Sequence, residues 1–188
     1  MARDVRARMI EGAVRLLARH GLQATSFAEV VALTGAPRGS IYHHFPEGKD
    51  QLISAAVDLA GARALHALDG LAGASAEDIA AAFIATWREL LTRSQLGAGC
   101  AVLAVTVATD SRDLLDHAGA VFRAWRERLA EMLERAGLTP GEAARFAAVL
   151  VAASEGAVAL SRAEQSMEPF NLVAAHLLEQ ARLLARRP

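Results

Sequence analysis

The residues best suited to chemistry in this 188-residue chain gather in one segment, residues 35–45, which reads GAPRGSIYHHF. Arg38 carries a charge, Ser40 and Tyr42 carry hydroxyl groups, and His43 and His44 carry imidazole rings. The paired histidines suggest a metal site or an acid–base pair, whereas the arginine and the hydroxyls suggest contact with phosphate. The local structure decides between these, because the backbone period determines which side chains share a face.

A helix over this segment sorts its side chains by face. Successive residues of an α-helix advance by about 100°, and Pro37 suits the first turn, where its missing N–H costs nothing. Ile41 and Phe45 are four residues apart and share a face that we expect to be buried. Gly39 and His43 fall opposite that face. The others lie between, with Ser40 and Tyr42 on the flanks and Arg38 and His44 nearest the buried edge.

This geometry argues against a metal site at the two histidines. Two ligands on one helix need a spacing of three or four residues to face one ion, and His43 and His44 are adjacent. No other ligand type lies nearby, so we expect no metal here.

Contact with DNA accounts for more of the segment. Arg38 can bind guanine or a phosphate, and its long side chain can reach outward from the first turn. Ser40, Tyr42 and His43 offer hydrogen bonds to phosphates or base edges. Gly39 would let a nucleic-acid backbone approach closely. The alternative is a polar surface helix without a function, which leaves a tyrosine and two histidines on about two turns unexplained.

The surrounding sequence predicts two further helices before this one. An amphipathic helix covers about 4–20 and stops at Gly21. Ser26 and Glu29 have the spacing of a capping box, so a second helix covers about 27–34. With the third helix at 37–45, this is the outline of a helix-turn-helix.

The rest of the chain also predicts helices. Six are expected, over about 49–68, 75–93, 100–109, 111–136, 140–162 and 170–185. The Val-rich stretch CAVLAVTVATD is ambiguous between a strand and a buried helix, and we interpret it as a helix because its neighbours are helical. We therefore expect an all-α chain of nine helices.

Composition fits a globular helical protein. Hydrophobic residues make up 53% of the chain and aromatic residues 5%, and Ala and Leu are good helix formers. No signal peptide is expected, because the N-terminus is amphipathic and charged and lacks a continuous apolar stretch. No membrane span is expected, because no segment reaches eighteen uncharged apolar residues. One cysteine, Cys100, excludes an intramolecular disulfide and a CxxC zinc site, so we expect a cytoplasmic protein.

Charge separates the two ends of the chain. The net charge is −1, but residues 1–50 hold seven Arg or Lys against five Asp or Glu, which leaves +2. The remainder has 13 basic and 16 acidic residues, which leaves −3. The mildly basic N-terminal end is the one that carries the helix-turn-helix pattern.

At these residues the chain resembles a known family. The stretch TSFAEVVALTGAPRGSIYHHFPEGKDQLISAAV resembles the DNA-binding domain of the TetR family of bacterial regulators, over about residues 5–60. The stretch GAPRGSIYHHFPEGKDQL, together with GCAVLAV later in the chain, resembles the LmrA/YxaF-like subgroup. The resemblance implies a homodimer of all-α, two-domain subunits. Residues 1–48 would be the DNA-binding domain and 49–188 the ligand-binding and dimerisation domain, linked by the helix at 49–68.

The resemblance also implies individual roles. Arg38, Gly39, Ser40, Tyr42 and His43 match recognition-helix contacts. Thr25 and Ser26 match a phosphate contact at the start of the second helix, and Lys49 matches one at the start of the fourth. Many members have Ser or Thr where this chain has Pro37, so we do not count Pro37 as a contact.

The C-terminal part offers candidates from composition alone. A mostly apolar cavity with a few polar points would suit Phe83, Trp87, Leu91, Cys100, Val105, Phe122, Trp125, Phe146, Ser154 and Glu155, although each could be an ordinary core residue. A buried Glu155 would need a partner or a ligand, because unpaired burial of a carboxylate is costly. Small and apolar residues of the last two helices suit a dimer interface or intrachain packing: Ala152, Ala153, Gly156, Ala159, Leu172, Ala175 and His176.

A cluster of acidic residues and a histidine at residues 113–117 has some features of a metal site. Asp113, Asp116 and His117 could share a helix face, but acids near a helix N-terminus are also favoured by the helix dipole, and we prefer that interpretation.

Together these features predict a ligand-responsive transcriptional repressor. A homodimer would bind a double-stranded, pseudo-palindromic operator and would be released by an apolar or aromatic small molecule, without a cofactor or metal. The alternatives are a helical small-molecule sensor or adaptor that does not bind DNA, and a small all-α enzyme. No nucleophile–base pair, phosphate loop or metal-ligand spacing supports the enzyme.

Overall fold

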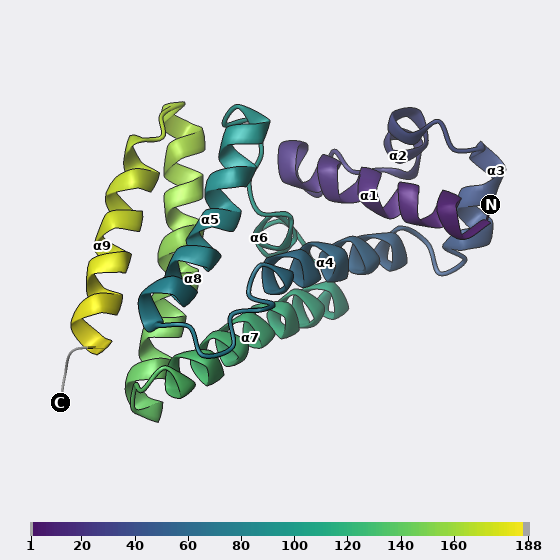
Figure 1. The fold of residues 1–188 in the computed structure, drawn as a ribbon. Coiled ribbons are helices and arrows are strands. Elements are labelled where there is room, and N and C mark those ends of the chain that lie inside the picture. Colours follow the sequence, from purple (N-terminus) through teal and green to yellow (C-terminus); the bar gives the residue numbers. More distant parts are fainter. Residues whose placement is uncertain (1, 186–188) are drawn as a thin grey trace. The chain divides into compact units, whose positions relative to one another are not determined.

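The computed structural model describes residues 2–185, and it is helical throughout this part, with no strand (Figure 1). The prediction of an all-α fold with nine helices is confirmed for these residues. The helices are α1 (Ala2–His20), α2 (Phe27–Thr34), α3 (Arg38–His44), α4 (Lys49–His66), α5 (Ala76–Ser94), α6 (Ala101–Thr106), α7 (Arg112–Arg135), α8 (Pro140–Glu164) and α9 (Glu168–Ala185).

Several predicted boundaries need correction. Pro37 is the N-cap of α3 and not its first helical residue, because its ψ of 128° is extended. The Val-rich stretch is helical as predicted, but α6 ends at Thr106, sooner than expected. Ser26 caps α2 by accepting the N–H of Glu29 at 3.2 Å. The Glu29 carboxylate does not return the bond, so only half of the predicted capping box forms.

The helices form two compact units, each described by itself. The first comprises residues 2–62 and 100–121, which hold α1 to α3, most of α4, α6 and the start of α7. Met9 and Leu17 of α1 are almost fully buried, as are Ile53 and Val57 of α4. These apolar side chains give the three N-terminal helices a core, which α2 and α3 need because they are too short to be stable alone.

Two glycines of the first unit mark close helix packing. A Cβ built on Gly12 of α1 would lie 2.5 Å from Cγ2 of Thr34, at the end of α2. A Cβ on Gly61 of α4 would lie 2.6 Å from Cγ1 of Val121 on α7. Both glycines are therefore needed by the chain's own packing, because protein interiors leave no room for an added methyl group.

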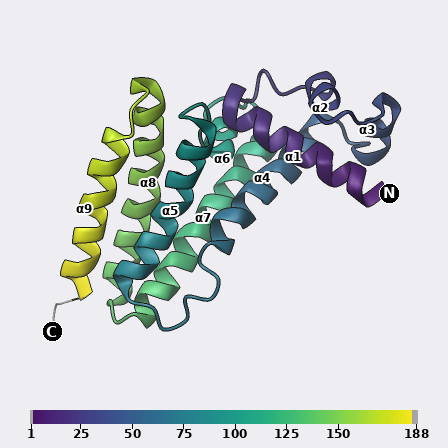
Figure 2. The same ribbon diagram turned by 45° about the horizontal axis from the view of Figure 1, so that its top comes forward.

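The second unit comprises residues 63–99 and 122–185. Helices α5, α8 and α9 pack against one another and lie side by side in both views (Figures 1 and 2). Helix α8 is the one described helix with the length and composition to cross a membrane. Half of its most apolar window is buried, and buried core helices of soluble proteins meet the same test. A single such helix is weak evidence for a span.

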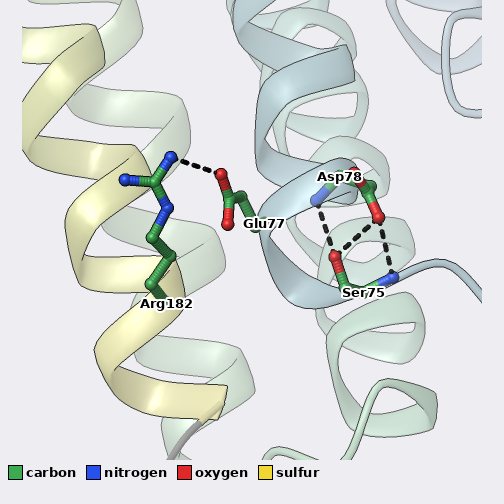
Figure 3. A network of polar contacts seen from close by, with 4 residues as sticks. All are labelled: Ser75, Glu77, Asp78 and Arg182. Carbon is green, nitrogen blue, oxygen red and sulfur yellow. Dashed lines mark hydrogen bonds and ion pairs between the residues drawn. The ribbon is translucent and has the colours of Figure 1, made fainter.

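Polar contacts fix the start of α5 (Figure 3). The Ser75 hydroxyl accepts the N–H of Asp78 at 3.1 Å, and the Asp78 carboxylate accepts the N–H of Ser75 at 3.3 Å. In the same turn, Glu77 accepts a 2.6 Å hydrogen bond from the guanidinium of Arg182 on α9. This bond raises the pKa of Arg182 above its ordinary value, and the contact ties the C-terminal turn of α9 to the first turn of α5.

Candidate nucleic-acid interface and effector site

Helix α3 buries the face that the sequence predicts. Ile41 and Phe45 are 2% and 0% exposed, whereas Tyr42 is 68% exposed. Arg38, Gly39 and His43 are also exposed, and Ser40 and His44 are half-buried. The exposed residues form one continuous polar surface, because positions 38, 39, 42 and 43 are neighbours on an α-helix.

Gly39 is unusual in this surface. A Cβ built on it would meet no atom within 4 Å, and its φ is not in the left-handed region. The chain's own packing therefore gives no reason for a glycine there. Glycine costs about 0.5–1 kcal/mol relative to alanine inside a helix. Close approach of another molecule would explain why the chain has a glycine here despite this cost.

Neighbouring groups orient some of the polar side chains. The Phe27 ring at the start of α2 makes an edge contact with the Tyr42 ring, with centroids 5.6 Å apart. This contact restricts the tyrosine while its side chain stays largely exposed. The Ser40 hydroxyl donates to the carbonyl of Pro37 at 2.6 Å. Its proton is therefore committed, and its oxygen can only accept a further hydrogen bond.

The residues matched to phosphate contacts differ in availability. Ser26 is half-buried, and its hydroxyl accepts a hydrogen bond, so its proton remains free to be donated. Lys49 donates one bond to the Leu22 carbonyl at 3.1 Å, which leaves two of its three N–H groups. Thr25 is fully buried, and its hydroxyl donates to the Gly21 carbonyl at 2.8 Å. Its main-chain N–H also donates, to the Leu22 carbonyl at 3.2 Å, so both donors of Thr25 are engaged within the turn before α2.

Comparisons with known proteins match both parts of the chain. The family model described as bacterial regulatory proteins, tetR family, matches residues 9–56. The model described as transcriptional regulator LmrA/YxaF-like, C-terminal domain, matches residues 76–176. The chain belongs to the TetR family. It is a transcriptional regulator of the LmrA/YxaF-like group, and both resemblances found in the sequence are confirmed.

Relatives of similar length support this placement. An uncharacterised HTH-type transcriptional regulator of Mycobacterium tuberculosis is 34% identical, over 97% of this chain and 96% of the relative. The HTH-type regulator YxaF of Bacillus subtilis is 30% identical, over 98% and 96%. The crystal structure of a TetR transcriptional regulator from Chloroflexus aurantiacus is 28% identical, covers 96% of both chains and has a TM-score of 0.78.

In the second unit, four of the predicted pocket residues form an aromatic cluster. The Trp125 ring lies 5.3, 5.8 and 6.3 Å from the rings of Phe122, Trp87 and Phe83, all in edge contacts. Trp87 and Ser154 are 4% and 1% exposed, and neither the indole N–H nor the hydroxyl has a hydrogen-bond partner. Unsatisfied buried polar atoms are rare in native proteins, so these two need an explanation.

The remaining pocket candidates are also buried, and they are divided between the two units. Leu91, Phe146 and Glu155 belong to the second unit and are 0%, 5% and 7% exposed. Cys100 and Val105 belong to the first unit. The Cys100 sulfur accepts the N–H of Leu103 at 3.4 Å and caps α6, so it has a structural role.

The residues predicted at a dimer interface lie on the surface of α8 and α9. Ala152, Gly156, Ala159, Leu172, Ala175 and His176 are exposed, and Ala153 is half-buried. Three larger residues, Val149, Leu160 and Leu183, are about half exposed on the same helices and were not predicted. Val149 and Leu160 lie three or four residues from predicted members of the set, which is a helical spacing, and Leu183 lies seven residues after His176. All three were missed because Val and Leu on an apolar helix resemble core residues.

The acidic cluster at the start of α7 has structural partners. Asp116 pairs with Arg112 at 3.1 Å on the same helix, and His117 Nε2 lies 2.8 Å from Asp58 Oδ1 on α4. Within the described residues, no group of three or more His, Cys, Asp or Glu side chains is placed to hold a metal ion.

Proposed function

We propose that this TetR-family regulator is a repressor that reads its operator with the exposed surface of α3. Arg38, Tyr42 and His43 would contact base edges or phosphates in the major groove, and Gly39 would let the DNA come close. The observation that carries this proposal is the combination of exposed polar side chains with a helical glycine that has open space in front of it.

We assign residues 1–48 to DNA binding and 49–188 to ligand binding and dimerisation. Ser26 and Lys49 would position the domain by donating to phosphates, since each retains an uncommitted proton. Thr25 would contribute indirectly, by holding the turn before α2 with both of its hydrogen-bond donors. Ser40 would accept a hydrogen bond from a base amino group, because its own proton is held by Pro37.

The proposed dimer joins two copies through α8 and α9. Val149, Leu160 and Leu172 are 52%, 51% and 66% exposed, a concentration of apolar surface that a partner helix pair would cover. Gly156 lies on this surface with no atom within 4 Å of a built Cβ, which permits close approach of another helix. A two-fold dimer would place its recognition helices about 34–36 Å apart, one turn of DNA, and so favours a pseudo-palindromic operator.

The proposed effector is an apolar or aromatic small molecule that binds at the aromatic cluster. The Trp87 indole N–H and the Ser154 hydroxyl would provide its polar contacts, since both are buried without a partner. Release of DNA requires that the effector bind the DNA-competent and DNA-incompetent forms of the dimer unequally. A regulator that acts in this way on the chromosome works in the cytoplasm.

The decisive experiment measures binding to the DNA upstream of the chain's own gene by fluorescence anisotropy. The wild-type dimer should bind that fragment sequence-specifically, and binding should weaken as salt rises. Arg38→Ala and Tyr42→Ala should each lose specific binding while circular dichroism and size-exclusion chromatography remain unchanged. Arg126→Ala is the matched control, because it removes one exposed charge from the part of α7 in the second unit, which contributes no residue to this surface. Wild-type affinity in either α3 variant would refute the assignment.

A further inference from the structure

A second candidate site lies at the connection between α4 and α5. There, segment 68–74 passes beside the C-terminal half of α7 (Figures 1 and 2). Side chains of the two segments line a cavity of about 120 Å³. All of its lining residues belong to the second unit. None of them is part of the proposed DNA interface, dimer surface or effector site.

The cavity has an apolar floor and a cationic rim. Leu68 and Met132 line it and are 1% and 6% exposed. Arg128 and Arg135 also line it, and their side chains are 38% and 71% exposed. The two arginines are seven residues apart, so both guanidinium groups lie on one face of α7, two turns from each other. The arrangement suits a ligand with a negative head and a short apolar body.

The guanidinium groups are only weakly engaged. Glu131 lies between them on the helix, but its carboxylate is 3.7 Å from Arg128 and 3.8 Å from Arg135. Both distances exceed a charged hydrogen bond, which is about 2.7–2.9 Å. The cavity's own acid, Asp69, is already paired with His66 at 2.7 Å. A carboxylate from outside would therefore form shorter bonds to the arginines than any acid now does.

We infer that this cavity binds a small organic carboxylate. Its oxygens would lie between the guanidinium groups of Arg128 and Arg135, and a tail of a few carbons would cover Leu68 and Met132. The volume is about that of four water molecules, at roughly 30 Å³ each, which limits the tail to a short one. The apolar floor favours an organic acid over inorganic phosphate, which would leave Leu68 and Met132 uncovered.

The test follows the backbone amides of Gly70 and Gly73 by NMR while sodium butyrate replaces sodium chloride at constant ionic strength. These amides lie in the cavity wall, so they report binding locally. Butyrate should shift them saturably. Acetate, which has the head without the tail, and 1-butanol, which has the tail without the head, should bind more weakly. Equal or tighter binding of phosphate would overturn the assignment to an organic acid.

Four variants separate this site from general charge attraction. Arg128→Gln and Arg135→Gln should each weaken butyrate binding by about tenfold, the usual consequence of losing a charged hydrogen bond. Glu131→Gln should strengthen binding, because it removes the competing carboxylate. Arg126→Gln, on the same helix outside the cavity, should change nothing. If butyrate shifts these amides no more than chloride does, or if Arg126→Gln acts like Arg128→Gln, the inference is wrong.

Discussion

Replacement of Gly39 by alanine should separate the stability of this protein from its binding to DNA. The added methyl group meets no atom of the chain within 4 Å, so the substitution introduces no clash in the free protein. It also removes the helical cost of glycine. That gain is about 0.5–1 kcal/mol in a helix interior, and we expect its lower end because Gly39 is only the second residue of α3.

Operator binding should move in the opposite direction. If the DNA backbone or a base edge approaches the α3 surface at Gly39, the methyl group must occupy space that the DNA requires. Loss of one well-formed base contact costs about 1–3 kcal/mol, and displacement of the helix would disturb the neighbouring contacts of Arg38 and Tyr42 as well. We therefore expect operator affinity to fall by at least about tenfold, with non-specific binding changed much less.

The assay pairs thermal unfolding with fluorescence anisotropy on the same preparation. A gain of about 0.5 kcal/mol corresponds to a rise of roughly 1–2 °C in the unfolding midpoint of a chain of this length. Gly119→Ala is the matched control, because Gly119 is also helical, lies on α7 and has open space around its Cβ position. It should gain stability and keep wild-type operator affinity. Wild-type affinity in Gly39→Ala would refute the argument that the glycine serves the DNA.

Three further substitutions test other parts of the molecule. Gly156→Phe should shift the dimer towards monomer in analytical ultracentrifugation without unfolding it, because Gly156 is exposed, its Cβ position meets no atom of the single chain within 4 Å, and the ring would obstruct a partner helix; an unchanged dimer would exclude this surface. Ser154→Ala should raise the free energy of unfolding by about 1 kcal/mol in chemical denaturation, since it removes a buried hydroxyl without a partner. A lower free energy of unfolding would mean that a water or another group satisfies the hydroxyl. Gly61→Ala should lower the free energy of unfolding by about 1–3 kcal/mol through overpacking against Val121, and Val121→Ala should restore much of it; additive losses in the double variant would contradict the contact.

Local signals accounted for most of the fold. The spacing of apolar residues located every helix, and side-chain caps at Ser75 and Thr139 placed two helix starts within a residue. The ends were less predictable. Pro37 can occupy either the cap or the first turn of a helix, and only the extended ψ of 128° distinguishes the two. The early end of α6 is equally invisible in the sequence, because valine fits both states.

The candidate site was predictable where it depends on the period of one helix. It was not predictable where it depends on individual hydrogen bonds or on packing between distant segments. The exposed face of α3 followed from the period of Ile41 and Phe45. The commitment of the Thr25 and Ser40 hydroxyls to backbone carbonyls could not be foreseen, because each requires knowledge of which turn lies four or three residues back. The cavity at Arg128 and Arg135 was missed for a similar reason: its other wall is a loop some 60 residues earlier in the chain.

The glycines distinguish two kinds of constraint on a helical surface. At Gly12 and Gly61 the chain itself forbids a methyl group, so packing explains them. At Gly39 and Gly156 it does not, and each lies on a surface proposed to meet another macromolecule. Gly119 also has open space at its Cβ position, but it lies on neither of these proposed surfaces. Open space alone therefore does not identify a binding surface. What singles out Gly39 is the set of exposed hydrogen-bonding side chains on the same face of α3, and binding by Gly39→Ala relative to Gly119→Ala measures how much that difference matters.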